Sequence, residues 1–234
     1  MRAETSKKIL KENRGSYDRM AKEFSNTRSK FWEELVFLKE HTNPDMQVLD
    51  IGCGNGRFYP LMKERKANYT GIDNSRGLLD EARGKFLEAN FVEGDATALP
   101  FPDASFDIAY SFAVVHHIPG RELQNTFFTE AARVLRPGGT LIITAWHLWR
   151  PRYLTRLLLQ AVRSMLFLSP LEVGDMMHTF GKDKHSRFLH AFTHKGLLRR
   201  MKKNGFAIVD SEVVGRASGS GEKNILIIAT KRIA

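Results

Sequence analysis

The chain has 234 residues, of which 42% are hydrophobic and 26% charged, and its formal net charge is +10. This length predicts one domain or one domain with an insertion, and the composition excludes a fibrous or wholly disordered protein. The single cysteine, Cys53, excludes an internal disulfide and favours a reducing compartment. The sequence has no signal-type segment and no apolar run of about 18 residues, so we expect a cytoplasmic protein without a membrane span.

A helical segment at 16–41 is expected first, and short apolar runs then alternate with helical patterns. We expect strands at 47–51, 69–72, 90–92, 106–111 and 140–145, and helices at 57–66, 75–88, 121–135 and 195–204. Alternation of this kind predicts an α/β fold, with a mostly parallel sheet and helices on both faces. Two last runs, 206–214 and 223–230, can form an antiparallel hairpin through the link at 215–221.

The positive charge is concentrated in residues 146–203, which hold 12 basic and 3 acidic residues, or +9 of the total. Such a block beside a nearly neutral body indicates either a face that meets a polyanion or a solvated basic surface. Within it, Arg152, Arg156 and Arg163 fall within about 40° of one another on a helix, and leucines fill the other sides. This amphipathic basic helix, near 150–168, could cover a substrate, face RNA or lie on a membrane surface.

A glycine-rich turn follows the first strand, where Asp50 is followed by Gly52, Gly54 and Gly56. Alternating glycines let the backbone turn sharply and let a ligand approach the main chain at the carboxyl end of the strand. The dinucleotide fingerprint needs its third glycine one residue later, at the position of Arg57. An acid before the turn also suits a cationic ligand group, so both departures count against NAD.

Acidic residues recur at the ends of the next strands, with Asp73 after the second and Asp95 after the third. A carboxylate at the first of these places can accept both hydroxyls of a ribose. A side chain at the second could accept from an adenine amino group. Each acid alone would more often be a turn former or helix cap, but the succession at strand ends favours one shared pocket.

Four motifs in this order resemble the class I S-adenosylmethionine-dependent methyltransferases of the methyltransferase type 11 group: DIGCGNG (50–56), GIDNS (71–75), GDATALPFPDASFD (94–107) and RVLRPGGTLIIT (133–144). The resemblance implies their Rossmann-like seven-stranded sheet and S-adenosylmethionine as cofactor. It implies cofactor contacts from Tyr17, Arg28, Asp50, Gly52, Cys53, Gly54, Asn55, Gly56, Asp73, Asn74, Asp95, Ala96, Thr97, Ser111, Phe112 and Ala113. Cys53 is expected as a small filler of the loop and has no nucleophilic role.

Within that group, YDRMAKEFSNTR (17–28), AVVHH (113–117) and the run at 187–192 resemble the tRNA wobble-uridine methyltransferases, which esterify 5-carboxymethyluridine. The resemblance implies catalytic roles for His116, Arg187 and His190, and substrate contacts from Trp32, His117, Trp146 and Phe188. Phe31 and the Phe188–Leu189 pair depart from residues that are frequent in this family. Methyl transfer to a carboxylate needs cations that orient it rather than a strong base.

We therefore expect an N-terminal helical cap over the cofactor (1–45), a methyltransferase core (46–145 and 195–234) and a basic substrate-binding insert (146–194). The expected partners are tRNA and, by resemblance, a small activator protein; we expect no metal and no membrane contact. Two alternatives remain open at this point. The protein could methylate a small or lipophilic acceptor, or it could be a cofactor-binding subunit that needs a partner.

Overall fold

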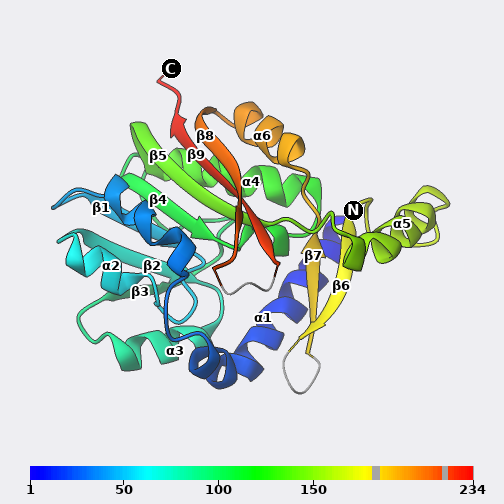
Figure 1. Cartoon of the computed structure of the whole chain (residues 1–234), viewed down its shortest axis with the longest axis horizontal. Coiled ribbons are helices and arrows are strands. Elements are labelled where there is room, and N and C mark those ends of the chain that lie inside the picture. Colours follow the sequence, from blue (N-terminus) through cyan, green and yellow to red (C-terminus); the bar gives the residue numbers. More distant parts are fainter. Residues whose placement is uncertain (181–184, 218–220, 234) are drawn as a thin grey trace.

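The computed structural model describes residues 1–180, 185–217 and 221–233. Its main sheet has seven strands in the order β3-β2-β1-β4-β5-β9-β8 (Figure 1). The strands are β1 (Gln47–Ile51), β2 (Asn68–Asp73), β3 (Asn90–Glu93), β4 (Phe106–Phe112), β5 (Leu135–Trp146), β8 (Phe206–Gly215) and β9 (Lys223–Lys231). Strands β1 to β5 pair in parallel, whereas β9 is antiparallel to both β5 and β8. The predicted fold class is confirmed.

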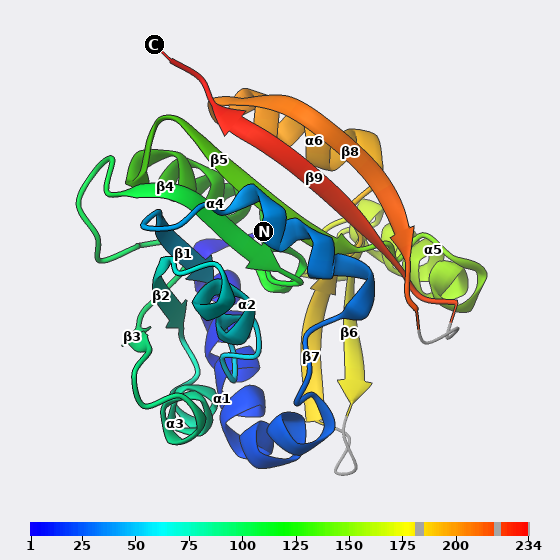
Figure 2. The same ribbon diagram turned by 60° about the vertical axis from the view of Figure 1, so that its left-hand side comes forward.

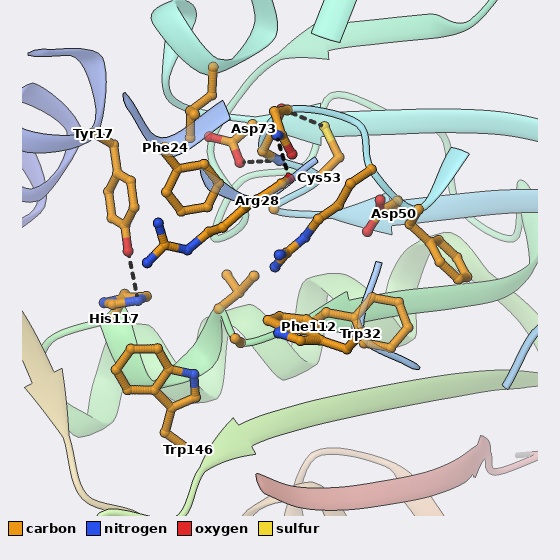
Figure 3. A pocket seen from close by; sticks show the side chains of 18 of the residues that line it. Tyr17, Phe24, Arg28, Trp32, Asp50, Cys53, Asp73, Phe112, His117 and Trp146 are labelled. Carbon is orange, nitrogen blue, oxygen red and sulfur yellow. Dashed lines mark hydrogen bonds between the residues drawn. The ribbon is translucent and has the colours of Figure 1, made fainter. Parts of the chain in front are cut away.

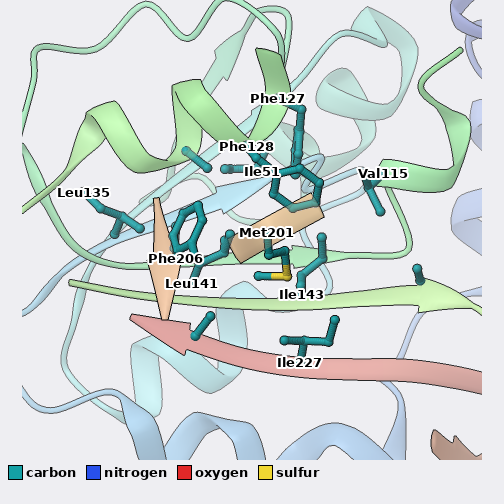
Figure 4. Packing of buried hydrophobic residues seen from close by; sticks show 14 of the residues in the cluster. Ile51, Val115, Phe127, Phe128, Leu135, Leu141, Ile143, Met201, Phe206 and Ile227 are labelled. Atoms are coloured by element: carbon teal, nitrogen blue, oxygen red, sulfur yellow. The ribbon is translucent and has the colours of Figure 1, made fainter. Parts of the chain in front are cut away.

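Helices cover both faces of this sheet. On one face, α4 (Arg121–Val134) and α6 (His194–Lys203) bury Phe127, Phe128 and Met201 against strand residues such as Ile143 (Figure 4). On the other face lie η1 (Glu33–His41), α2 (Tyr59–Glu64) and α3 (Arg76–Lys85). Because β1 and β4 are sheet neighbours although two strands separate them in the chain, the connections leave a crevice at their carboxyl ends.

The N-terminal helix begins and ends earlier than the predicted helical segment at 16–41, whose last part is the separate 3₁₀ helix η1. Helix α1 spans Ala3–Thr27 and crosses the carboxyl ends of the strands in the view of Figure 2. Its buried face includes Ser6, Asn13 and Ser16 as well as apolar side chains. Because polar residues interrupt the apolar periodicity of the buried face, the sequence pattern did not predict the first turns of this helix.

The insert after β5 forms a helix and a separate hairpin. Helix α5 (Pro151–Met165) is followed by β6 (Asp175–Phe180) and β7 (His185–His190), which pair antiparallel. A small core of Tyr153, Leu157 and Met176 joins α5 to this hairpin. The hairpin was not predicted. The predicted helix near 150–168 is present, whereas part of the predicted link at 215–221 lies outside the described residues.

Candidate functional site

A cavity of about 870 Å³ lies at the carboxyl ends of β1, β2 and β4 (Figure 3). Residues from α1, from the turn after each of these strands and from the insert line it. Of the predicted cofactor contacts, the lining includes Tyr17, Arg28, Asp50, Gly52, Cys53, Gly54, Asn55, Asp73, Asn74, Asp95, Ala96, Thr97, Phe112 and Ala113. Segments far apart in the sequence therefore converge on one hollow, as the succession of motifs predicted.

The glycine turn is fixed to the next strand by a hydrogen bond from Gly54 N to Asp73 Oδ2, 2.9 Å long. Gly52 and Gly54 have φ values of 76° and 57°, in the left-handed region that favours glycine. A Cβ atom at Gly54 would meet no atom closer than 4.0 Å, because this residue faces the cavity. Gly56 instead faces Phe91, 2.8 Å from its ideal Cβ position, and does not line the cavity.

Asp50 is fully buried beside this turn. Its Oδ2 accepts a hydrogen bond of 2.8 Å from the hydroxyl of Tyr69. Burial raises the pKa of Asp50 from 3.8 to about 7, although the Tyr69 bond opposes the shift. A carboxyl group with a pKa of about 7 becomes more fully ionised when a cation lies next to it. The sequence predicts a cationic ligand group in this part of the cavity.

Two acceptors on the cavity wall fit an adenosine. Asp73 Oδ1 accepts from Ser75 N and Oδ2 from Gly54 N. The backbone N–H of Asn74 also bonds to this carboxylate, so of its four lone-pair sites one is left for a ribose hydroxyl. Asp95 accepts from both the backbone N and the hydroxyl of Thr97 through Oδ1, which leaves Oδ2 as an acceptor. The residues present therefore fit the predicted nucleoside.

A hydrogen-bonded chain connects α1, the turn after β4 and the insert. His117 Nδ1 lies 3.0 Å from the carbonyl oxygen of Phe188, which can only accept, so Nδ1 carries the proton. Nε2 then accepts from the Tyr17 hydroxyl at 3.0 Å, and that hydroxyl accepts from Arg187 Nη1 at 3.4 Å. Burial lowers the pKa of His117 to about 3, with Arg187 adding to the effect, so the ring is neutral.

The other end of the cavity is cationic and aromatic. Arg187 lies 4.6 Å from the centroid of the Trp146 ring, and Arg57 lies 3.8 Å from that of Trp32. Burial, together with the nearby Arg28 and Arg216, lowers the pKa of Arg57 to about 10. The Nε atoms of Arg187 and Arg216 and the indole Nε1 of Trp146 are buried without a hydrogen-bond partner among the described residues. The guanidinium groups that line this end of the cavity favour an acceptor-rich ligand.

Five predicted contacts lie outside the lining. Gly56 packs against Phe91, as described, and Ser111 is buried with its hydroxyl donating to Ile51 O. His116 is fully buried behind Trp146, with ring centroids 5.0 Å apart. His190 Nδ1 is held 2.6 Å from Asp175, and the Phe188 side chain is fully buried. Sequence adjacency placed these residues near the site, but the local backbone directs their side chains away from the cavity.

Several lining residues were not predicted, among them Phe24, Arg57 and Arg216. Phe24 is on α1, and its ring lies 4.6 Å from the Arg28 guanidinium. Arg57 had a signal in the sequence, since it occupies the place of a fingerprint glycine. Arg216, which directly follows β8, had no signal in the sequence, because only the antiparallel pairing of β8 with β9 brings it to the cavity. Among the residues that the structure describes, no group of three His, Cys, Asp or Glu side chains could hold a metal, and no helix could span a membrane.

The sequence is similar to those of known methyltransferases. Residues 49–143 match the family described as "Methyltransferase domain". An Encephalitozoon cuniculi protein whose name assigns it to the methyltransferases is 32% identical over 201 residues, or 83% of this chain and 86% of that protein. The mouse tRNA (carboxymethyluridine(34)-5-O)-methyltransferase ALKBH8 is 37% identical over 131 residues; the match covers 56% of this chain but only 19% of the relative.

Solved structures share the fold. A S-adenosylmethionine-dependent methyltransferase from Methanosarcina mazei superposes with a TM-score of 0.71 at 23% identity, over 88% of this chain and all of that one. The second is from a complex between the Haloferax volcanii Trm112 methyltransferase activator and a methyltransferase. It has a TM-score of 0.68 at 16% identity and covers 95% of this chain and 98% of that one. Both matches cover a larger share of the chain than the family segment does.

Proposed function

This chain belongs to the S-adenosylmethionine-dependent methyltransferases, and from that premise we propose that its acceptor is the carboxymethyl group of a tRNA wobble uridine. The cofactor supplies a methyl group on a sulfonium. Asp73 would hold the ribose, Asp95 the adenine, and Asp50 with the backbone of Gly52 and Gly54 the methionine part. These individual roles stay predictions, supported by the fit of the acceptors described above.

The observation that carries the proposal is the presence of two guanidinium groups, those of Arg187 and Arg216, beside Trp146 in the cavity lining. A carboxylate offers only acceptors, so it suits the donors of these two groups. A guanidinium also binds a carboxylate bidentately. The flat face of Trp146 beside Arg187 would suit a pyrimidine ring that is turned out of a loop.

The state of His117 supports the same kind of acceptor. Both ring nitrogens are used in hydrogen bonds, and a pKa of about 3 makes the ring a poor base. His116 is outside the cavity lining, and burial lowers its pKa as well. A site without a strong base suits a nucleophile that is already ionised at neutral pH, as a carboxylic acid is.

Support for tRNA comes from charge and from relatives. The segment 146–203, with +9 net charge, includes Arg152 and Arg187 of the cavity lining and could meet anticodon-stem phosphates. Two further proposals rest on the same ground: a cytoplasmic location, where tRNA is abundant, and a requirement for a small activator, as named in the Haloferax volcanii complex.

The test uses labelled S-adenosylmethionine and three acceptors: tRNA with 5-carboxymethyluridine at the wobble position, the same tRNA with unmodified uridine, and free carboxylic acids including fatty acids. Each reaction is run with and without a Trm112-type activator, and the products are digested to nucleosides. We expect label only in the methyl ester of 5-carboxymethyluridine. Label in a fatty or small acid alone would overturn the tRNA assignment, and cofactor binding without any transfer would favour a subunit that lacks its partner.

A further inference from the structure

Helix α5 lies at the edge of the molecule (Figures 1 and 2). Many of its apolar side chains are exposed. Leu158 is 54% exposed, Met165 65% and Phe167, just after the helix, 95%. The other exposed apolar side chains of this segment are Leu154, Leu159, Val162, Leu166 and Leu168. Elsewhere in the described chain the exposed large apolar residues are separated in sequence, whereas here they form one cluster on and beyond one helix.

The helix has three distinct sides. Tyr153 and Leu157 are buried and attach it to the β6–β7 hairpin. At 100° per residue, Leu154, Leu158, Val162 and Met165 fall within about 80° and form the apolar side. The side with Arg152, Arg156 and Arg163 is centred about 140° from the apolar one. This separation is that of a helix lying in an interface, with apolar side chains on one side and cations on the other.

The positive charge around α5 indicates what kind of surface the helix would bind. Residues 146–171 contain four arginines and no acidic residue. Arg156 and Arg163 line a second cavity of about 530 Å³ between α1 and α5, with Lys8 and Glu12 from α1. Three cations against one acid in this hollow favour an anionic occupant such as a lipid phosphate.

Contrary to the expectation from the sequence that the protein makes no membrane contact, we propose that α5 docks on the surface of a bilayer that contains anionic lipids. The exposed leucines and Phe167 would enter the acyl boundary, and the arginines would meet headgroup phosphates. Nucleic acid would leave the apolar side chains in water. A groove on a protein binds one narrow apolar stripe of a helix. In α5 the exposed apolar residues are spread more widely, because Leu159 lies about 100° from Leu158 and residues 166–168 beyond the helix are exposed as well. A fluid lipid surface can accommodate both the apolar side of α5 and residues 166–168.

The test is sedimentation of the full chain with phosphatidylcholine vesicles that contain about a quarter phosphatidylglycerol, and with pure phosphatidylcholine vesicles. We expect binding to the anionic vesicles to be about tenfold stronger and to weaken as salt is added. The double variant Leu158→Asp with Phe167→Asp should lose at least about tenfold in vesicle binding. Arg156→Gln with Arg163→Gln should remove most of the preference for anionic lipid.

The matched control is Leu87→Asp, because Leu87 is 88% exposed but lies after α3. It should bind vesicles as the unaltered protein does, and all variants should keep the same unfolding temperature and the same affinity for S-adenosylmethionine. Failure of the unaltered protein to sediment would overturn the proposal, as would unchanged sedimentation of the Leu158 and Phe167 variant. Loss of tRNA binding or of self-association in that variant, without a change in vesicle binding, would assign the surface to RNA or to a second copy instead.

Discussion

The Tyr17 hydroxyl and His117 Nε2 lie 3.0 Å apart and join the N-terminal helix to the turn after β4. Since the carbonyl of Phe188 fixes the proton on Nδ1, the hydroxyl must donate to Nε2 and present its lone pairs to Arg187. The Tyr17 hydroxyl therefore donates to the histidine and also holds the guanidinium of Arg187 in the cavity.

Replacing Tyr17 by Phe removes this hydroxyl while the ring keeps its edge contacts with Phe24 and His117. We expect kcat/KM for methyl transfer to fall about tenfold, equivalent to about 1.4 kcal/mol, because Arg187 loses its anchor. Steady-state kinetics measure this effect. Tyr59→Phe, a buried tyrosine of α2 outside the cavity lining, is the control. Equal losses in the two variants would mean that the Tyr17 hydroxyl has only a structural role.

Asp73→Asn tests the nucleoside end of the cavity. The amide keeps the shape of the carboxylate but loses its charge and one acceptor oxygen, so the bonds to Gly54 N and to ribose cannot all form. We expect at least about a tenfold loss of affinity for S-adenosylmethionine in calorimetry. Asp80→Asn, on the exposed side of α3, should bind normally. A normal dissociation constant for the Asp73 variant would contradict the assignment.

Asp50 gives a pH-dependent stability. Its folded-state pKa of about 7 lies above the ordinary 3.8, so the folded protein holds this proton more tightly than the unfolded chain. The contribution is therefore full below pH 3.8 and is lost as the pH rises to about 7. Relative to Asp50→Asn, the cofactor-free protein should lose up to about 4 kcal/mol of unfolding free energy across this range. Denaturant titrations at several pH values measure the difference, and a constant difference would contradict the raised pKa.

Gly52→Ala should destabilise the fold through a specific clash. The new Cβ would lie 2.3 Å from Val114 Cγ2, and φ is 76°. Gly138→Ala is the matched control, because Gly138 also has a φ of 76° but no atom within 4 Å of its Cβ position. We expect a loss of about 1 kcal/mol at Gly138 and about 2–4 kcal/mol at Gly52. Val114→Ala should restore part of the Gly52 loss, and equal losses at the two glycines would argue against the clash.

Arg187→Lys separates charge from stacking. Lysine keeps the positive charge but lacks the planar fork that lies over Trp146 and Phe180. We expect KM for the acceptor to rise about tenfold while affinity for S-adenosylmethionine is unchanged. A variant with normal acceptor KM would remove Arg187 from acceptor binding, and a variant with weakened cofactor binding would move it to the other end of the cavity.

The sequence determined the α/β alternation, the positions of the core strands and the acids at strand ends, although β5 begins at Leu135, five residues before its predicted start. These features are local: apolar runs form strands, and glycine turns and acids such as Asp73 are recognised from neighbours in the chain. The same local information could not separate His116 from His117, which are adjacent, although one is buried in the core and the other lines the cavity.

Tertiary structure alone decided which cations reach the cavity and which side of α5 faces solvent. Arg216 comes from the strand pair at the end of the chain, and Tyr17 meets His117 across 100 residues. Likewise, the apolar side of α5 is exposed because Tyr153 and Leu157 already attach the helix to the hairpin. Periodicity along a chain shows that a helix has different sides, but only packing between distant segments determines which of them is buried.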